Sequence, residues 1–136
     1  MNTNVIITAS DIKYGDFLIE HWYKSLKDTC NLSNIDVFVI DYGLSTAQKF
    51  YLEHNGVKVF KGEKDGHVVI IRFRETKKIL STYNYDQALL CDSGDIIFQQ
   101  DISPLFSRNK EQFRAAEEDI KSPFQSLLRM NFSQMI

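Results

Sequence analysis

Short runs of apolar and β-branched residues recur along the chain, and segments with a different period separate them. Runs of this kind are typical of strands that are buried on both faces of a sheet. We expect four such strands, at residues 4–9, 35–40, 57–60 and 87–91. With helices between the strands, the order is β-α-β-α-β. This order predicts an α/β fold with a mostly parallel, Rossmann-like sheet and helices on both of its faces.

The segments between the strands carry the period and the end signals of helices. Three apolar residues spaced four apart form one stripe of a helix over residues 14–29: Leu18, Trp22 and Leu26. Ser45 and Gln48 form a capping box that opens a second helix. Asn55 and Gly56 end that helix, because these residue types accept the left-handed backbone of a helix stop.

The pattern after the third strand is less distinct. Residues 67–71 have strand propensity, but a helix over residues 69–81 fits the spacing better. Four residues fit one face of that helix: Val69, Phe73, Thr76 and Leu80. We also expect a short helical turn at residues 102–106 and a further strand at residues 113–118.

Composition and charge exclude several classes of protein. The chain has 136 residues, 43% of them hydrophobic and 25% charged, which is ordinary for one folded domain. A net charge of −2 gives no electrostatic reason to bind nucleic acid or an anionic membrane. No apolar run approaches the roughly 18 residues of a membrane helix, and the N-terminus lacks the pattern of a secretion signal. Cys30 and Cys91 have no metal-binding spacing, so we expect a cytoplasmic protein.

Small and acidic residues follow three of the expected strands. They are Thr8, Ala9, Ser10 and Asp11 at the end of the first strand, Asp41, Tyr42 and Gly43 at the end of the second, and Asp92, Ser93, Gly94 and Asp95 at the end of the fourth. Ligands of open α/β sheets collect at the carboxyl ends of the strands. Acids at three strand ends on one rim repel each other unless a cation lies among them, and Mg²⁺ or Mn²⁺ with a phosphorylated ligand suits such oxygen donors. Turn chemistry is the alternative explanation for each strand end, and Asp11 can simply cap the first helix.

Four patches resemble glycosyltransferases of the GT-A fold, close to the family 8 type, over residues 4–118. Residues 6–11 with Tyr14 are similar to the first strand and loop of that family, and residues 39–45 to its second strand and helix start. Arg72, with Arg74 as the alternative, lies on a segment that resembles the helix carrying a basic residue toward the donor. Residues 92–106, which end in Asp-Ile-Ser-Pro-Leu-Phe, resemble the metal motif and are the most specific patch.

The resemblance implies a metal-dependent transfer of a sugar from a nucleotide-diphosphate donor, expected to be a UDP-sugar. Asp92 and Asp95 would hold Mn²⁺ or Mg²⁺, and Arg72 would add positive charge at the leaving diphosphate. The remaining donor-binding residues that it implies are Thr8, Ala9, Ser10, Asp11, Tyr14, Asp41, Tyr42, Ser93 and Gly94. The acceptor, a glycan, a lipid or a protein, stays open, as do association into homo-oligomers and peripheral contact with a membrane.

Two departures from the family pattern support other hypotheses. The family motif is usually Asp-x-Asp, whereas two residues separate Asp92 from Asp95 here, so which acid contacts the metal stays open. The acceptor-binding half of the family would lie beyond Ile136, so we expect residues 1–136 to form the nucleotide-binding half alone. A non-catalytic nucleotide-binding or protein-interaction module is therefore the main alternative. A nucleotidyltransferase is a weaker one, because it requires a glycine-rich first loop that is absent here.

Overall fold

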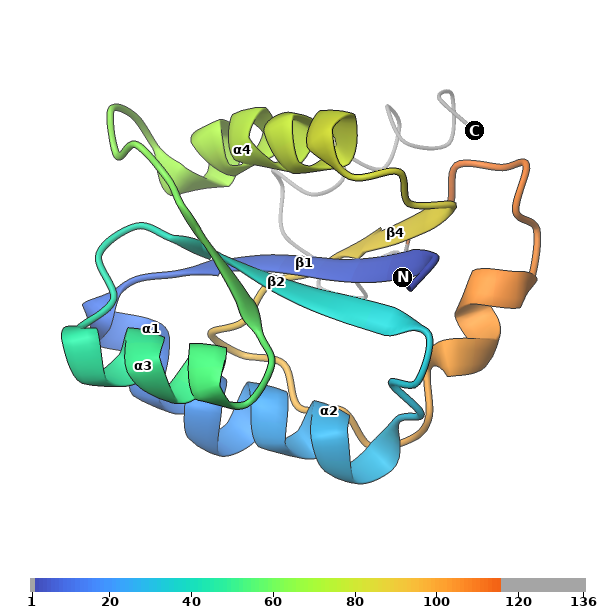
Figure 1. Cartoon of the computed structure of the whole chain (residues 1–136), viewed down its shortest axis with the longest axis horizontal. Coiled ribbons are helices and arrows are strands. Elements are labelled where there is room, and N and C mark those ends of the chain that lie inside the picture. The colour runs from blue at the N-terminus through green and yellow to red at the C-terminus, as the bar shows by residue number, and fades with distance from the viewer. Residues whose placement is uncertain (1, 116–136) are drawn as a thin grey trace, which may run out of the picture.

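The computed structural model describes residues 2–115, in which a four-stranded sheet lies between two layers of helices (Figure 1). β1 (Asn4–Ser10) pairs with β2 (Ile35–Asp41) on one side and with β4 (Gln87–Leu90) on the other. β3 (Lys58–Lys61) pairs with the far side of β2. Every pairing is parallel, in the order β3-β2-β1-β4, which confirms the predicted α/β class.

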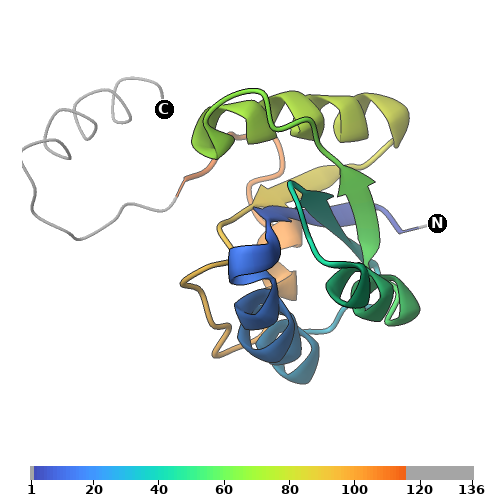
Figure 2. The ribbon, with the colours of Figure 1, turned by 90° about the vertical axis from the view of Figure 1, so that its left-hand side faces the viewer.

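One helical layer comes from the segment after β1 and the segment after β2 (Figures 1 and 2). The first segment starts with α1 (Ile12–Phe17), continues as a π-helix, η1 (Leu18–Tyr23), and ends as α2 (Lys24–Thr29). The helix predicted over residues 14–29 is thus confirmed, but it begins earlier and contains a π-helical stretch. α3 (Thr46–His54) opens with the predicted capping box and is followed by Gly56 at a φ of +84°.

α4 (Val68–Thr82) covers the opposite face of the sheet (Figure 2). The helix agrees with the prediction over residues 69–81, but the predicted face is wrong. Of the four residues predicted for this face only Thr76 is buried, and Val69, Phe73 and Leu80 are exposed. The other buried residues of the helix are Glu75 and Ile79. Glu75 occupies a position in the buried stripe, so the buried residues of this helix do not form a continuous apolar period.

The two helical layers enclose two apolar cores. The core under α1, η1, α2 and α3 contains Ile6, Leu18, Trp22, Leu26, Val37, Val39 and Leu52. The core under α4 contains Val5, Ile7, Phe38, Ile40, Tyr42 and Ile79. Alternate residues of β1 and β2 face opposite layers, as a strand buried on both sides requires. The two cores hold the sheet rigidly, so the loops at its carboxyl edge start from fixed positions.

The chain after β4 has little regular structure in the described residues. A 3₁₀ helix, η2 (Ser103–Ser107), stands where a turn at residues 102–106 was predicted. Residues 113–115 do not form the predicted strand, and residues 116–118 lie outside the described residues. Within residues 2–115, no helix has both the length and the apolar character needed to cross a membrane.

Candidate functional site

The strand ends with predicted site residues are neighbours at the carboxyl edge of the sheet. β1 is the central member of the three, since it pairs with both β2 and β4. The amide of Tyr42 donates to the carbonyl of Ser10 at 2.9 Å, which joins the first two strand ends. The hydroxyl of Ser93 donates to the carbonyl of Ala9 at 2.8 Å, which joins the last strand end to the first.

The acidic loop, residues 91–95, is anchored by its backbone and small residues. Nε1 of Trp22, from the π-helical stretch, donates to the carbonyl of Asp92 at 2.9 Å. Ser93 is buried, whereas Asp92 and Asp95 are exposed. A Cβ added to Gly94 would lie 3.3 Å from Cδ1 of Tyr14, so the ring and the loop are close together. Hydrogen bonds therefore anchor the backbone of the loop, and its two carboxylates face solvent.

Arg72 of α4 reaches across the edge of the sheet to the acidic loop. Its Nη1 donates to Oδ1 of Asp92 in an ion pair. Its Nε is buried and has no hydrogen-bond partner among the described residues. The structure thus brings together two of the three residues predicted to be catalytic. The guanidinium is bound to one of the carboxylates that the sequence assigned to a metal.

The fit of a divalent cation can be tested on the donor atoms of the acidic loop. Within residues 2–115, no three His, Cys, Asp or Glu side chains are grouped as a cation site. Burial raises the pKa of the Cys91 thiol to about 12, so the thiol is protonated at neutral pH when no cation is bound. Asp92 and Asp95 are oxygen donors of the type that Mg²⁺ and Mn²⁺ prefer. They fit a cation whose remaining ligands come from a phosphorylated molecule and water, and they do not fit a cation enclosed by protein alone.

The loop after β1 combines a helix cap with groups that face solvent. Oδ1 of Asp11 accepts from the amide of Tyr14 at 3.1 Å and caps α1, as the alternative interpretation predicted. Oδ2 of Asp11 lies 3.9 Å from Nζ of Lys64, a residue that the sequence analysis did not single out. The Tyr14 side chain is 45% exposed, which leaves ring surface free for a ligand. Thr8 is buried beneath this loop, and its hydroxyl has no partner in the described residues.

Asp41, the last residue of β2, and Tyr42, which follows it, are occupied by contacts within the chain. Oδ1 of Asp41 accepts from the amides of Gly43 at 2.8 Å and Leu44 at 2.6 Å, in a turn where Gly43 has a φ of +126°. Tyr42 is buried, and its hydroxyl donates to Glu75 at 2.7 Å. These contacts give both residues a structural role, and their predicted part in nucleotide binding stays a prediction.

Glu75 is the centre of a buried charge cluster that the sequence analysis missed. Besides Tyr42, it accepts from Nε of Arg74 at 2.9 Å. Arg74 also pairs with Asp65 at 2.8 Å and donates to the carbonyl of Glu63, which ties the loop before α4 to the helix. Burial raises the pKa of Glu75, but the hydrogen bonds from Tyr42 and Arg74 outweigh it and leave the pKa below its ordinary value. Arg74 therefore positions the loop that carries Lys64, rather than standing in for Arg72 at the acidic loop.

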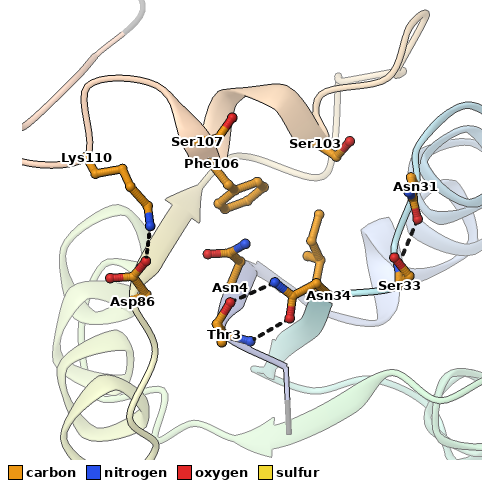
Figure 3. Close-up of a pocket in the computed structure, with 11 residues that line it drawn as sticks. Thr3, Asn4, Asn31, Ser33, Asn34, Asp86, Ser103, Phe106, Ser107 and Lys110 are labelled. Carbon is orange, nitrogen blue, oxygen red and sulfur yellow. Dashed lines mark hydrogen bonds and ion pairs between the residues drawn. The ribbon is translucent and has the colours of Figure 1, made fainter.

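A pocket of about 290 Å³ lies at the opposite, amino edge of the sheet (Figure 3). Its walls include Asn4 at the start of β1, Ile35 at the start of β2 and Phe106 of η2. Asn34 is held in place there, because its side chain bonds to the amide and the hydroxyl of Thr3 (Figure 3). None of the site residues predicted from the sequence lines this pocket, although Ser103 and Phe106, from the end of the patch that resembles the metal motif, do.

Comparisons with known proteins find similarity in fold but not in sequence. No protein-family model matches the chain, and no curated protein sequence matches it. Similar solved structures include the galactosyltransferase LgtC in complex with donor and acceptor sugar analogues and an active-site mutant of LgtC. Each superposes with a TM-score of 0.57 at 18% identity and covers 77% of this chain.

This likeness shows a GT-A glycosyltransferase-like fold, in agreement with the sequence-based resemblance. The narrower assignment to family 8 stays a prediction. The chain spans 42% of the length of the galactosyltransferase structures, so what those enzymes bind and transfer comes to this chain only as a proposal.

Proposed function

We propose that this chain binds a nucleotide-diphosphate sugar, expected to be a UDP-sugar, at the carboxyl edge of its sheet and takes part in metal-dependent transfer of the sugar. The observation that carries the proposal is the convergence of Arg72, the acidic loop and the loop after β1 at this edge of a GT-A-like sheet. Parallel α/β sheets bind their ligands at this edge. The resemblance to glycosyltransferases supports a sugar as the group transferred.

The loop after β1 would bind the nucleoside. The exposed ring of Tyr14 offers a face on which a base can stack, and the neighbouring Gly94 leaves room beside it. Oδ2 of Asp11 can accept a hydrogen bond from the nucleoside, because Oδ1 makes the helix cap and Lys64 lies 3.9 Å from Oδ2. Lys64, at 3.9 Å from Asp11, brings a positive charge to the same side. These three side chains would orient the nucleoside so that its phosphates extend toward the acidic loop.

The acidic loop and Arg72 would act on the diphosphate. Negative charge develops on the diphosphate as the bond to the sugar breaks, and fixed positive groups stabilise it. Arg72 supplies a guanidinium, which matches phosphate oxygens with paired donors. Asp92 and Asp95 would hold Mn²⁺ or Mg²⁺, which supplies further positive charge at the leaving group when bound. The hydrogen bonds of Trp22 and Ser93 anchor the loop from which the two carboxylates extend.

Release of UDP from UDP-sugars tests this function directly. We expect the chain with Mn²⁺ to release UDP from one or more UDP-hexoses, by transfer or by slow hydrolysis. The double variant D92N/D95N should lower the rate by roughly 100-fold or more, because it removes the cation ligands. D28N is the matched control, since Asp28 is an exposed carboxylate on α2 that pairs with Lys24. Equal rates in D92N/D95N and the unmodified chain would contradict the metal-dependent mechanism.

A second candidate is a nucleotide-binding module without transferase activity. The ion pair between Arg72 and Asp92 favours it, because it occupies one of the expected cation ligands. Calorimetry with UDP separates the two candidates when it is combined with the turnover assay. Binding of UDP without release of UDP from any tested UDP-sugar supports the module. For both candidate functions we propose a cytoplasmic location, which the two unpaired cysteines support because thiols persist in a reducing compartment.

A further inference from the structure

We propose that Arg72 is an exchangeable clasp on Asp92, which disfavours a free cation at the acidic loop until a nucleotide diphosphate takes over the guanidinium. Cation and nucleotide would then bind as a coupled pair, each raising the affinity of the other. The proposal deepens the proposed function, on which it rests, by describing how that site is controlled.

The clasp is open enough to solvent to be exchanged. The side chain of Arg72 is 29% exposed and that of Asp92 is 56% exposed. An ion pair this exposed contributes little to stability, because water screens it and two long side chains must be ordered. The arrangement also leaves the buried Nε of Arg72 without a partner among the described residues. A ligand with more acceptor atoms than one carboxylate oxygen can therefore compete for the guanidinium.

The expected cation site has only two protein ligands among the described residues, Asp92 and Asp95, so it depends on Asp92 more than a site with several protein ligands depends on any one of them. Within the described part of the chain, no third carboxylate, imidazole or thiol joins Asp92 and Asp95. The clasp occupies one oxygen of this short donor set and places a positive charge beside it. The positive guanidinium repels a cation that approaches Asp92, and it competes with the cation for the carboxylate oxygen. Both effects lower the affinity of Asp92 for the cation. Both effects oppose a free cation in the absence of nucleotide.

A diphosphate would remove both obstacles at once. Its oxygens can accept from the guanidinium in paired geometry, and the same diphosphate can supply the ligands that the cation lacks. In residues 2–115, Arg72 is the only Lys or Arg that forms an ion pair with the acidic loop, since Arg74 is bound to Glu75 and Asp65. The exchange therefore depends on this one side chain. Coupling of this kind is reciprocal between the two ligands.

Titration of the full chain with Mn²⁺ alone, followed by the electron paramagnetic resonance signal of free Mn²⁺, tests the clasp. R72Q should bind Mn²⁺ about three- to tenfold more tightly than the unmodified chain, since an exposed ion pair is weak. K77Q is the matched control, because it removes one exposed positive charge from the same helix without touching Asp92. Adding D92N to R72Q should abolish the gain, which locates the cation at Asp92.

The second measurement is the factor by which Mn²⁺ raises the affinity for UDP. We expect this factor to be smaller in R72Q than in K77Q and the unmodified chain, because no clasp remains to be released. An Mn²⁺ affinity in R72Q that equals or falls below that of K77Q overturns the clasp, even if UDP still binds with Mn²⁺. Failure of the unmodified chain to bind UDP with any cation overturns the proposed function as well. The two failures are thus distinguishable.

Discussion

At the scale of single residues, the contact between Gly94 and Tyr14 links the first and the last loop of the site. The glycine lies where a Cβ would stand 3.3 Å from the ring, which is tighter than an ordinary contact. Its side-chain hydrogen lets the ring of Tyr14 lie against the acidic loop while 45% of the side chain stays exposed. Glycine at this position therefore leaves space for the ring of Tyr14 and is not required by a positive backbone φ.

We predict that G94A weakens UDP binding about three- to tenfold, because the added methyl group moves the Tyr14 ring from its place. The free energy of unfolding should change by no more than about 0.5 kcal/mol, since the residue is exposed. Calorimetry with UDP and Mn²⁺ measures the first quantity, and urea denaturation the second. Y14F is the companion variant, which keeps the ring and should bind UDP nearly as well. An unchanged UDP affinity in G94A contradicts a role for the ring in binding.

At the scale of elements, α4 shows what the pattern of residues can and cannot predict. The helix itself was predicted from the spacing of its residues, against the strand propensity of residues 67–71, but most of its buried face was not. Glu75 lies in the buried stripe between apolar residues, so the apolar period points to Val69 and Phe73, which are exposed. A carboxylate in a core is favourable only with partners that are distant in sequence, here the hydroxyl of Tyr42. No local pattern contains that information.

The buried carboxylate of α4 makes stability depend on pH. The pKa of Glu75 is below its ordinary value of 4.5 in the folded chain, so its contribution is present above pH 4.5. It is lost as the pH falls below 4.5 through the lowered pKa. We predict that E75Q lowers the free energy of unfolding at pH 7 by roughly 1–3 kcal/mol, because a charged acceptor is removed from Tyr42 and Arg74.

Urea denaturation between pH 7 and pH 3 checks this prediction. The difference between E75Q and the unmodified chain should shrink as the pH falls below 4.5. E53Q is the control, since Glu53 is an exposed carboxylate on α3, and it should follow the unmodified chain throughout. A difference that stays constant with pH would mean that ionised Glu75 does not stabilise α4.

At the scale of the whole molecule, the order of strands and helices determined most of the fold. Parallel pairing followed from the alternation of elements, and three strand ends with Asp became neighbours because β1 pairs with both β2 and β4. The same reasoning located the loop with Asp92 and Asp95 at the predicted edge. It could not tell that Arg72 would pair with Asp92, or that Tyr42 would turn into the core, since side-chain contacts over such separations leave no periodic trace.

The open edge of the sheet also belongs to this scale. β4 pairs only with β1 in the described residues, and Leu90 is 43% exposed. Unpaired strand edges favour association, so homo-oligomers stay a prediction for the chain. The sequence has three further apolar residues from which association would be expected, Phe124, Leu127 and Leu128, and they lie outside the described residues.

Calorimetric titration of UDP into the chain, with Mn²⁺ and with a chelator, tests most directly whether this edge of the sheet is a metal-assisted nucleotide site. The same titration of D92N/D95N in Mn²⁺ completes the measurement. We predict that UDP binds in Mn²⁺, that the chelator weakens binding at least tenfold, and that the double variant in Mn²⁺ behaves like the chelated chain. Equal UDP affinity under all three conditions, or no binding under any of them, would contradict a cation held at Asp92 and Asp95 for a nucleotide diphosphate.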